Sequence, residues 1–317
     1  MCSELLSIII PVHNTAQYLK RTLNILECQV FRNFEIIIIN DNSSDDTEKI
    51  VLSFQKEYNN IKYYKNKTTK GPGLSRNFGL KHSKGNFVTF LDSDDWTDLC
   101  TYDTAIDIMN KNANCDFVIW GIKKEYNNKY SSYIRTDYKN YTVINQELAL
   151  SLLCNTYSLD VTISSYLGNK MFRKSFLDNN VILFKESLFE DVAFSFQTIA
   201  YSKEIILIPN SYTHYYQRTH SIVHSFNKNH IYDMFSILSF IKDIVDTKNL
   251  HLKKDYNSLV EKCSKTLFTM MYENIEEIKE LNKLLCVYFK CLFKLCSLEE
   301  ILEYLDVERV KKILLYF

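Results

Sequence analysis

The stretch "FVTFLDSDDW" (residues 87–96) changes character halfway along its length. Its first five residues suit a buried β-strand, and they lead directly into Asp92, Asp94 and Asp95. A polar turn would end a strand in the same way, because Asp and Ser are common turn residues. The stretch by itself therefore leaves two interpretations open: a turn, or a site that needs negative charge.

The segments around this stretch predict an alternation of strands and helices. "LLSIIIPV" (residues 5–12), "FEIIIIND" (34–41) and "IKYYKN" (61–66) are rich in β-branched and aromatic residues, which favour strands. Apolar spacing and helix-opening acids predict the helices between the strands, over residues 17–28, 45–58 and 73–82. This alternation predicts an α/β fold, with an open, mostly parallel sheet flanked by helices and joined by right-handed crossovers.

The rest of the chain predicts a second, helical region. "CDFVIWGI" (residues 115–122) and residues 205–208 are further predicted strands, whereas apolar residues recur at helical spacing beyond about residue 227. We therefore expect two domains, an α/β domain over residues 1–226 and a C-terminal helical region over 227–317.

Polar groups follow three of the predicted strands at the point where each strand ends, over residues 11–14, 40–44 and 92–95. Ligands of open α/β sheets bind outside the carboxyl ends of the strands. Because three strands deliver polar or acidic groups to the same edge, the pattern favours a binding site over an isolated turn.

Composition narrows the classes of partner and compartment. Lys and Arg total 38, as do Asp and Glu, so no net charge attracts the chain to nucleic acid. We expect no secretory leader and no membrane span, because the apolar run near the start is short and no stretch approaches about 20 apolar residues. The nine cysteines form no Cys-x-x-Cys pair, which is typical of a protein in the reducing cytoplasm.

Five segments together resemble the family-two glycosyltransferases of the GT-A fold. They are "SIIIPVHNTAQYLKRTL", "FEIIIINDNSSDDT", "GPGLSRNFGL", "GNFVTFLDSDDW" and "FEDVAFSFQ", in the order and roughly the spacing of that family. The resemblance covers about residues 5–226. It implies an inverting transfer of a sugar from a nucleotide sugar, most often a UDP-sugar, to a hydroxyl of a glycan or lipid-linked glycan. The expected pathway is bacterial synthesis of a surface polysaccharide, lipooligosaccharide or capsule.

The resemblance identifies the acids at residues 92–94 as the family's Asp-x-Asp. It implies that Asp94 binds Mn²⁺ or Mg²⁺, that Asp92 assists near the ribose or a metal-bound water, and that Ser93 lies in the same nucleotide-sugar site. The chemistry agrees, because carboxylates alone would repel a diphosphate, whereas they readily hold a hard divalent cation.

Other residues of the nucleotide site also follow from the resemblance. Asp41 would accept a hydrogen bond from the base, Pro11, Val12 and Asn14 would line the nucleoside, and Arg76 would lie near the nucleotide. The alternatives are a turn carboxylate for Asp41 and a surface arginine for Arg76.

The resemblance places the acceptor chemistry later in the chain. Asp191 would be the catalytic base and Glu190 would orient the acceptor, although two acids also stabilise a helix N-terminus without any catalytic role. "GNKMFRKSF" contributes Asn169 and Lys170 as acceptor-site candidates. "HYYQRTHSIVHSF" contributes Arg218 and His220 as candidates for contact with the diphosphate or the metal.

Two other functions and two roles for the C-terminal helices remain open. A non-catalytic nucleotide-sugar- or glycan-binding scaffold would keep the fold without the activity. A sugar nucleotidyltransferase would need a Gly-rich, basic loop after the first strand, which "PVHNTAQYLKR" lacks. The C-terminal helices mix Lys with large apolar residues, so they fit either self-association or peripheral contact with the inner face of the membrane.

Overall fold

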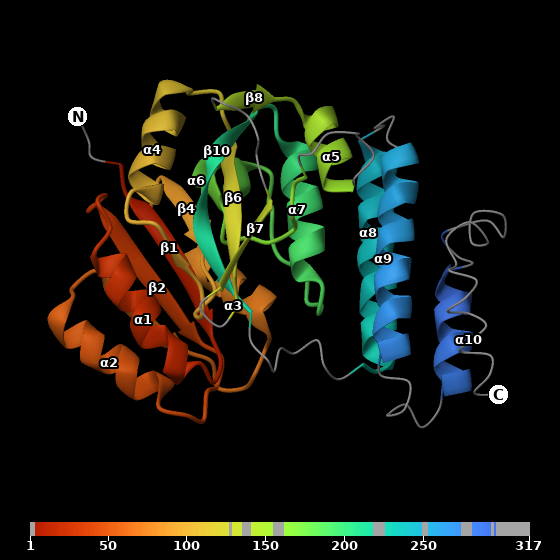
Figure 1. The fold of residues 1–317 in the computed structure, drawn as a ribbon, viewed down its shortest axis with the longest axis horizontal. Helices are drawn as coiled ribbons and strands as arrows, with labels where there is room; N and C mark the ends of the chain where they lie inside the picture. Colours follow the sequence, from red (N-terminus) through yellow and green to blue (C-terminus); the bar gives the residue numbers. More distant parts are fainter. Residues whose placement is uncertain are drawn as a thin grey trace. The chain divides into compact units, whose positions relative to one another are not determined.

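The protein is described by a computed structural model that covers residues 4–126, 129–134, 141–154, 162–217, 226–248, 253–273, 281–292 and 295 (Figure 1). The chain divides into two compact units. Unit 1 comprises residues 1–153, 159–186 and 190–217, and unit 2 comprises residues 154–158, 187–189 and 218–317.

A single mixed sheet forms the centre of unit 1. Its strand order is β3-β2-β1-β4-β9-β6-β10-β5, with β7 paired to β6 and β8 paired to β10. The strands are β1 (Leu6–Val12), β2 (Phe34–Asn40), β3 (Ile61–Lys65), β4 (Phe87–Phe90), β5 (Trp96–Thr97), β6 (Phe117–Tyr126), β7 (Lys129–Ile134), β8 (Thr142–Ile144), β9 (Lys170–Arg173) and β10 (Ile205–Tyr216).

The two halves of this sheet differ in strand direction. Strands β3, β2, β1 and β4 are all parallel, with Ile8 opposite Ile36 and Thr89. Strand β9 then runs antiparallel between β4 and β6, and β10 runs parallel to β6 but antiparallel to β5. The predicted α/β fold with a mostly parallel open sheet is confirmed, and the antiparallel β9 at its centre is an addition that the sequence pattern did not indicate.

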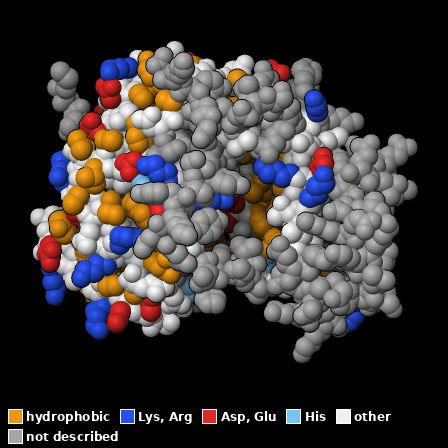
Figure 2. Space-filling view, viewed as in Figure 1, with side chains coloured by type: hydrophobic (Ala, Val, Ile, Leu, Met, Phe, Trp, Pro, Cys, Tyr) orange, Lys and Arg blue, Asp and Glu red, His pale blue; other side chains and the backbone are white. Residues whose placement is uncertain are grey.

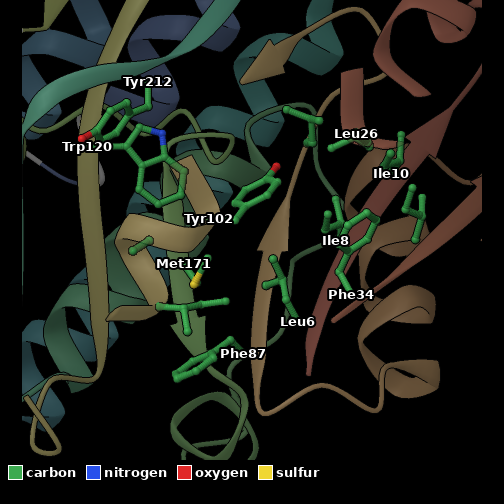
Figure 3. Packing of buried hydrophobic residues seen from close by; sticks show 14 of the residues in the cluster. Leu6, Ile8, Ile10, Leu26, Phe34, Phe87, Tyr102, Trp120, Met171 and Tyr212 are labelled. Carbon is green, nitrogen blue, oxygen red and sulfur yellow. The ribbon is translucent and has the colours of Figure 1, made fainter. Parts of the chain in front are cut away.

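Helices cover both faces of the sheet. They are α1 (Ala16–Glu27), α2 (Thr47–Glu57), α3 (Pro72–His82), α4 (Thr101–Lys111), α5 (Gln146–Cys154), α6 (Lys174–Asn179) and α7 (Glu190–Tyr201). Alternate side chains of β1, including Leu6, Ile8 and Ile10, pack in one cluster with residues of α1, α2 and α4 (Figure 3). The opposite face meets α3, where a Cβ added to Gly79 would lie 2.4 Å from the Ile9 side chain. Burial on both faces explains why β1 and β2 are almost continuously apolar.

Unit 2 is helical in its described part, which confirms the predicted helical C-terminal region. It contains α8 (Lys228–Thr247), α9 (Lys253–Glu273) and α10 (Leu281–Leu292). Helix α8 contacts both α9 and α10, and the Tyr288 ring packs against Phe235 and Phe268. No helix among the described residues combines the length and the apolar character that a membrane crossing requires.

The surface of the described residues carries both signs of charge. On the face shown in Figure 2, Lys and Arg side chains are interspersed with Asp and Glu side chains. This mixture agrees with the equal totals of basic and acidic residues in the sequence.

Candidate active site

The carboxyl ends of β1 and β2 are joined by hydrogen bonds between the loops that follow them. The Asp41 backbone N–H donates to the Val12 carbonyl at 2.8 Å. Asn14, which has a positive φ of 52°, accepts the Ser44 N–H on its side-chain oxygen at 2.8 Å. Its own N–H donates to the Ser43 hydroxyl at 3.0 Å. The predicted nucleoside residues Val12 and Asn14 thus connect the two loops, and Pro11 precedes them at the end of β1.

The Asp41 carboxylate holds the start of α3. It is 3% exposed, and its oxygens accept hydrogen bonds from the Asn66 side chain at 2.7 Å, the Lys70 N–H at 2.9 Å and the Gly71 N–H at 2.8 Å. Gly71 has a φ of 86°, a left-handed conformation that glycine adopts without strain. Asp41 therefore fixes the loop that leads into α3 and Arg76.

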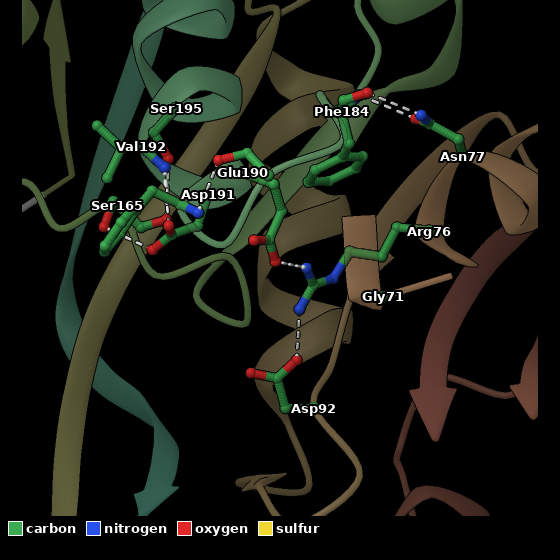
Figure 4. Close-up of polar contacts among 12 residues, drawn as sticks. Gly71, Arg76, Asn77, Asp92, Ser165, Phe184, Glu190, Asp191, Val192 and Ser195 are labelled. Atoms are coloured by element: carbon green, nitrogen blue, oxygen red, sulfur yellow. Dashed lines mark hydrogen bonds and ion pairs between the residues drawn. The ribbon is translucent and has the colours of Figure 1, made fainter. Parts of the chain in front are cut away.

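Arg76 connects two strongly separated parts of the sequence. Its guanidinium donates to Asp92 Oδ1 and to Glu190 Oε1, both at 2.8 Å (Figure 4). The residue is 5% exposed, so the alternative of a surface arginine is wrong. Burial works against its charge, but Asp92 and Glu190 outweigh this effect and raise the pKa of Arg76.

Two residues of α3 near Arg76, Gly73 and Asn77, allow this helix to approach the segment before α7 closely. A Cβ added to Gly73 would lie 2.9 Å from Glu190 Cγ and 3.0 Å from the Lys185 carbonyl oxygen, so glycine permits the close approach of α3 to Glu190. The Asn77 side chain both donates to the Phe184 carbonyl at 2.9 Å and accepts its N–H at 2.8 Å (Figure 4). Helix α3 thus holds the segment that leads towards α7.

Side chains of α1 hold the acidic turn after β4 through hydrogen bonds to its backbone carbonyls. Arg21 of α1 donates to the Asp94 carbonyl at 2.6 Å, and the Thr22 hydroxyl lies within 3.0 Å of the Ser93 carbonyl oxygen and 2.9 Å of the Asp95 carbonyl oxygen. Arg21 also stacks on the Trp96 ring, with 3.9 Å between the guanidinium carbon and the ring centroid. These contacts fix the turn through its carbonyls, and the Asp92 side chain is 36% exposed.

Asp95 is fully buried behind this turn. Its carboxylate accepts the Tyr166 hydroxyl at 2.5 Å and the Tyr216 N–H at 2.8 Å. Burial, together with the charges of Asp92 and Asp94, raises the pKa of Asp95 well above its ordinary value.

Asp92 and Asp94 provide a donor set that fits a divalent cation. Among the residues that the structure describes, no group of three or more His, Cys, Asp or Glu side chains is arranged as a complete metal site. A complete protein cage is not needed, because Mg²⁺ is usually bound by one or two carboxylates together with substrate phosphates and water. Asp92, whose side chain is partly exposed, and Asp94, two residues further along the same turn, match this incomplete set.

Asp191 and Glu190 open α7 and point to different partners. The Asp191 carboxylate accepts the Ser165 hydroxyl at 2.8 Å and the Val192 N–H at 2.9 Å (Figure 4). Glu190 is 6% exposed and faces Arg76. Burial raises the pKa of Glu190, although the Arg76 charge works in the opposite direction. Asp191 is thus half-buried and contacts Ser165, whereas Glu190 is buried and pairs with Arg76.

The remaining predicted residues lie beneath the site or outside the described part. Asn169 and Lys170 are fully buried, and Asn169 donates to the Trp120 carbonyl at 2.6 Å. Arg218 and His220 lie outside the described residues.

Three residues of this region have no counterpart in the sequence-based prediction. Ser165 and Tyr166 contact Asp191 and Asp95, respectively, and the Tyr215 ring packs 5.1 Å from the Tyr166 ring, measured between centroids. Burial and the nearby carboxylates, Asp95 first, raise the pKa of Tyr215 to about 12. The excess of tyrosine in the sequence was the available signal, but it does not single out these two.

The fold of this chain is similar to that of solved structures. Staphylococcus aureus TarS residues 1–349, solved in complex with UDP, matches 94% of this chain and 77% of its own with a TM-score of 0.64 and 21% identity. GalNAc-T7, solved with UDP, GalNAc and Mn²⁺, matches 82% of this chain and 51% of its own with a TM-score of 0.57 and 15% identity. At these identities the likeness shows the fold alone, which is that of GT-A glycosyltransferases.

Comparisons of sequence show the family. The GalNAc(5)-diNAcBac-PP-undecaprenol beta-1,3-glucosyltransferase of Campylobacter jejuni is 32% identical over 189 residues, which are 58% of this chain. The match spans 61% of that relative, less than two thirds of its length. The family model described as Glycosyl transferase family 2 matches residues 7–177, more than half of the chain. The chain therefore belongs to glycosyl transferase family 2.

Proposed function

We propose that this protein is an inverting glycosyltransferase that moves a sugar from a UDP-sugar to a hydroxyl of a glycan acceptor. The observation that carries the proposal is the Arg76 bridge, which joins Asp92 to the residue next to Asp191. One buried side chain thereby links one candidate metal ligand to Glu190, which directly precedes the candidate base in the sequence. Family membership gives the reaction class to which this arrangement is suited.

On the donor side, Asp92 and Asp94 would hold a divalent cation, Mn²⁺ or Mg²⁺. The bound cation supplies a Lewis acid that stabilises the negative charge of the departing diphosphate. Asp41, Pro11, Val12, Asn14 and Ser93 would form the nucleoside end of the same site, at the carboxyl ends of β1, β2 and β4. Asp41 acts there by fixing the loop that leads into α3.

On the acceptor side, Asp191 would take the proton of the attacking hydroxyl. As that oxygen forms its bond to the anomeric carbon, the bond between this carbon and the diphosphate breaks on the opposite face of the sugar. No covalent intermediate with the protein is required, so the anomeric configuration inverts. Ser165 and the Val192 N–H each contact one oxygen of Asp191 and orient it for a step typically worth about 10²–10⁴-fold in rate.

The acceptor class follows from the relative's printed name. The Campylobacter protein is named for an undecaprenol-linked substrate, so we propose a glycan or lipid-linked glycan acceptor in bacterial surface polysaccharide, lipooligosaccharide or capsule synthesis. Such an acceptor would be met in the cytoplasm at the inner face of the membrane.

Calorimetric titration tests the donor site without knowledge of the acceptor. UDP, GDP and dTDP are titrated into the full chain in Mn²⁺ and again in EDTA. We expect UDP to bind in Mn²⁺, to bind at least tenfold more weakly in EDTA, and to lose the metal dependence in Asp94→Asn. Asp107→Asn is the matched control, because Asp107 is exposed on α4 and pairs only weakly with Lys111.

Two results of this titration would contradict the proposal. Folded wild-type protein that binds none of the three nucleotides would favour the non-catalytic scaffold. Equal loss of binding in Asp94→Asn and Asp107→Asn would remove Asp94 from the metal site.

A further inference from the structure

One loop, residues 163–168, contacts two acids of the candidate site, Asp191 and Asp95. Its Ser165 hydroxyl donates to Asp191 Oδ2 at 2.8 Å, and the adjacent Tyr166 hydroxyl donates to Asp95 Oδ2 at 2.5 Å. Asp191 is the proposed base, and Asp95 directly follows the proposed metal ligands. The path of this loop therefore sets the surroundings of both acids.

Two backbone carbonyls of the loop accept hydrogen bonds from one ammonium group, that of Lys170. Lys170 Nζ donates to the Ser164 carbonyl at 2.8 Å, to the Asn169 side-chain oxygen at 3.0 Å and to the Tyr166 carbonyl. Three N–H donors thus meet three acceptors, which satisfies the ammonium completely. Lys170 is 0% exposed, a rare position for lysine that requires this kind of pairing.

Lys170 itself is fixed by the centre of the sheet. It is the first residue of β9, it lies opposite Ile119 of β6, and its carbonyl accepts the Thr89 hydroxyl of β4 at 2.8 Å. The Lys170 side chain therefore extends from a strand of the sheet to the loop. Sites built on strands and helices keep their geometry better than sites built on loops.

Two further features bear on the loop and on Lys170: the glycine at position 168 and the charge of Asp191. A Cβ added to Gly168 would lie 2.2 Å from the Tyr166 hydroxyl oxygen, so only glycine leaves room for the Tyr166 ring. Burial lowers the pKa of Lys170 to about 7, and the Asp191 carboxylate opposes this shift. The negative charge of Asp191 thus favours the charged form of Lys170.

We propose that Lys170 is a positioning residue, whose ammonium holds the 163–168 loop so that Ser165 orients Asp191 for proton removal. This inference rests on the proposed function. An apolar side chain would fill the same space, but it would leave the Ser164 and Tyr166 carbonyls buried without donors. The loop would then move to satisfy them, and a shift of about 1 Å at a reacting group can cost about 10²-fold in rate.

The test compares Lys170→Met with Ser165→Ala and with the double variant in the full chain. The probe is UDP release from UDP-glucose, UDP-galactose or UDP-GlcNAc with water as the acceptor, beside calorimetric binding of UDP. We expect Lys170→Met to lower kcat at least tenfold while the donor KM and the UDP Kd stay within about threefold. The double variant should lose little more than Lys170→Met alone, because both changes act through Ser165.

A matched control separates positioning from general stability. Lys62→Met removes a lysine at the amino end of β3, where Lys62 is ion-paired with Glu35. This variant should keep kcat within about twofold. If Lys170→Met does not fold, Lys170→Gln replaces it. Because Gln retains two N–H donors, we expect of it a smaller loss of kcat than of Lys170→Met, with the same non-additivity with Ser165→Ala.

The outcomes distinguish this inference from the function on which it rests. Wild-type protein that neither binds UDP nor releases it from a UDP-sugar would overturn both. Active wild type with unchanged kcat in Lys170→Met, or with fully additive losses in the double variant, would overturn the positioning role alone. A parallel loss of UDP binding and kcat would also overturn it, because the whole site would then have collapsed.

Discussion

The sheet of unit 1 carries a buried polar cluster at each end, and the two clusters are built differently. The amino-end cluster surrounds Glu35 of β2, which accepts the Ser7 hydroxyl at 2.6 Å, the Lys84 N–H at 2.6 Å and the Lys62 ammonium. The carboxyl-end cluster has two parts: Asp92 and Glu190 both pair with Arg76, and Asp95 accepts hydrogen bonds from Tyr166 and Tyr216.

The difference lies in how the negative charge is compensated. At the amino end one carboxylate has a lysine and two further donors. Burial alone would raise the pKa of Glu35, but these partners outweigh burial and lower it. At the carboxyl end Arg76 is shared between Asp92 and Glu190. Burial and neighbouring acids there raise the pKa values of Asp95 and Glu190. In the first cluster the partners of the carboxylate outweigh burial, whereas in the second burial and neighbouring acids outweigh the partners of Asp95 and Glu190.

Asp191→Asn should produce the largest effect on catalysis. The amide keeps the shape of the carboxylate and its contact with Ser165, but it cannot remove a proton. We expect UDP release from a UDP-sugar to fall about 10²–10⁴-fold, with the UDP Kd from calorimetry unchanged. Activity within threefold of wild type would assign the base to another residue.

Arg76→Met should produce the largest effect on stability. It leaves Glu190 buried without its cation, which typically costs about 3–5 kcal/mol in the free energy of unfolding. The chain's two tryptophans, Trp96 and Trp120, both lie in unit 1, so their fluorescence in urea reports the unfolding of this unit.

The pH dependence of Arg76→Met sharpens the comparison between the clusters. Without Arg76 the folded-state pKa of Glu190 should rise further above its ordinary value. The stability of the variant should therefore fall as the pH rises through that folded-state pKa. The loss relative to wild type should be greater at pH 8 than at pH 5, and adding Glu190→Gln should recover part of it. A loss that is equal at both pH values would mean that packing, rather than charge, dominates.

The parallel half of the sheet could be predicted because its signals are local. Continuous apolar runs ending in acids appear in the sequence itself, and β1, β2 and β4 occupy those runs. The fold, the helical C-terminal region and the family were all available from such motifs. The assigned roles of Asp41, Asp94 and Asp191 remain predictions.

The other half was less accessible because its contacts join distant residues without a period. Ser165 and Asp191 are 26 positions apart, and Tyr166 and Asp95 are 71 apart. The resemblance marks Lys170 as an acceptor-site candidate, but it does not predict the full burial of this lysine in β9, which lies between β4 and β6. Hydrophobic patterning predicts strands, but it does not predict which polar groups a buried strand end must satisfy.

Glu35→Gln should produce the smallest effect and the opposite dependence on pH. The folded-state pKa of Glu35 lies below its ordinary value of 4.5, so its charge stabilises the fold above that value. This contribution is lost as the pH falls through the folded-state pKa. We expect a loss of about 1–3 kcal/mol in the free energy of unfolding at pH 7, which shrinks as the pH approaches 3.

The control for this prediction is Asp107→Asn, which removes an exposed i,i+4 pair with Lys111 and should change stability by less than about 0.5 kcal/mol. Glu35→Gln should leave UDP release unchanged, because the amino-end cluster lies at the end of the sheet opposite the site. A pH-independent loss would show that Glu35 stabilises through shape alone. If the two clusters then responded to pH in the same direction, charge compensation would no longer distinguish the structural end of the sheet from the chemical one.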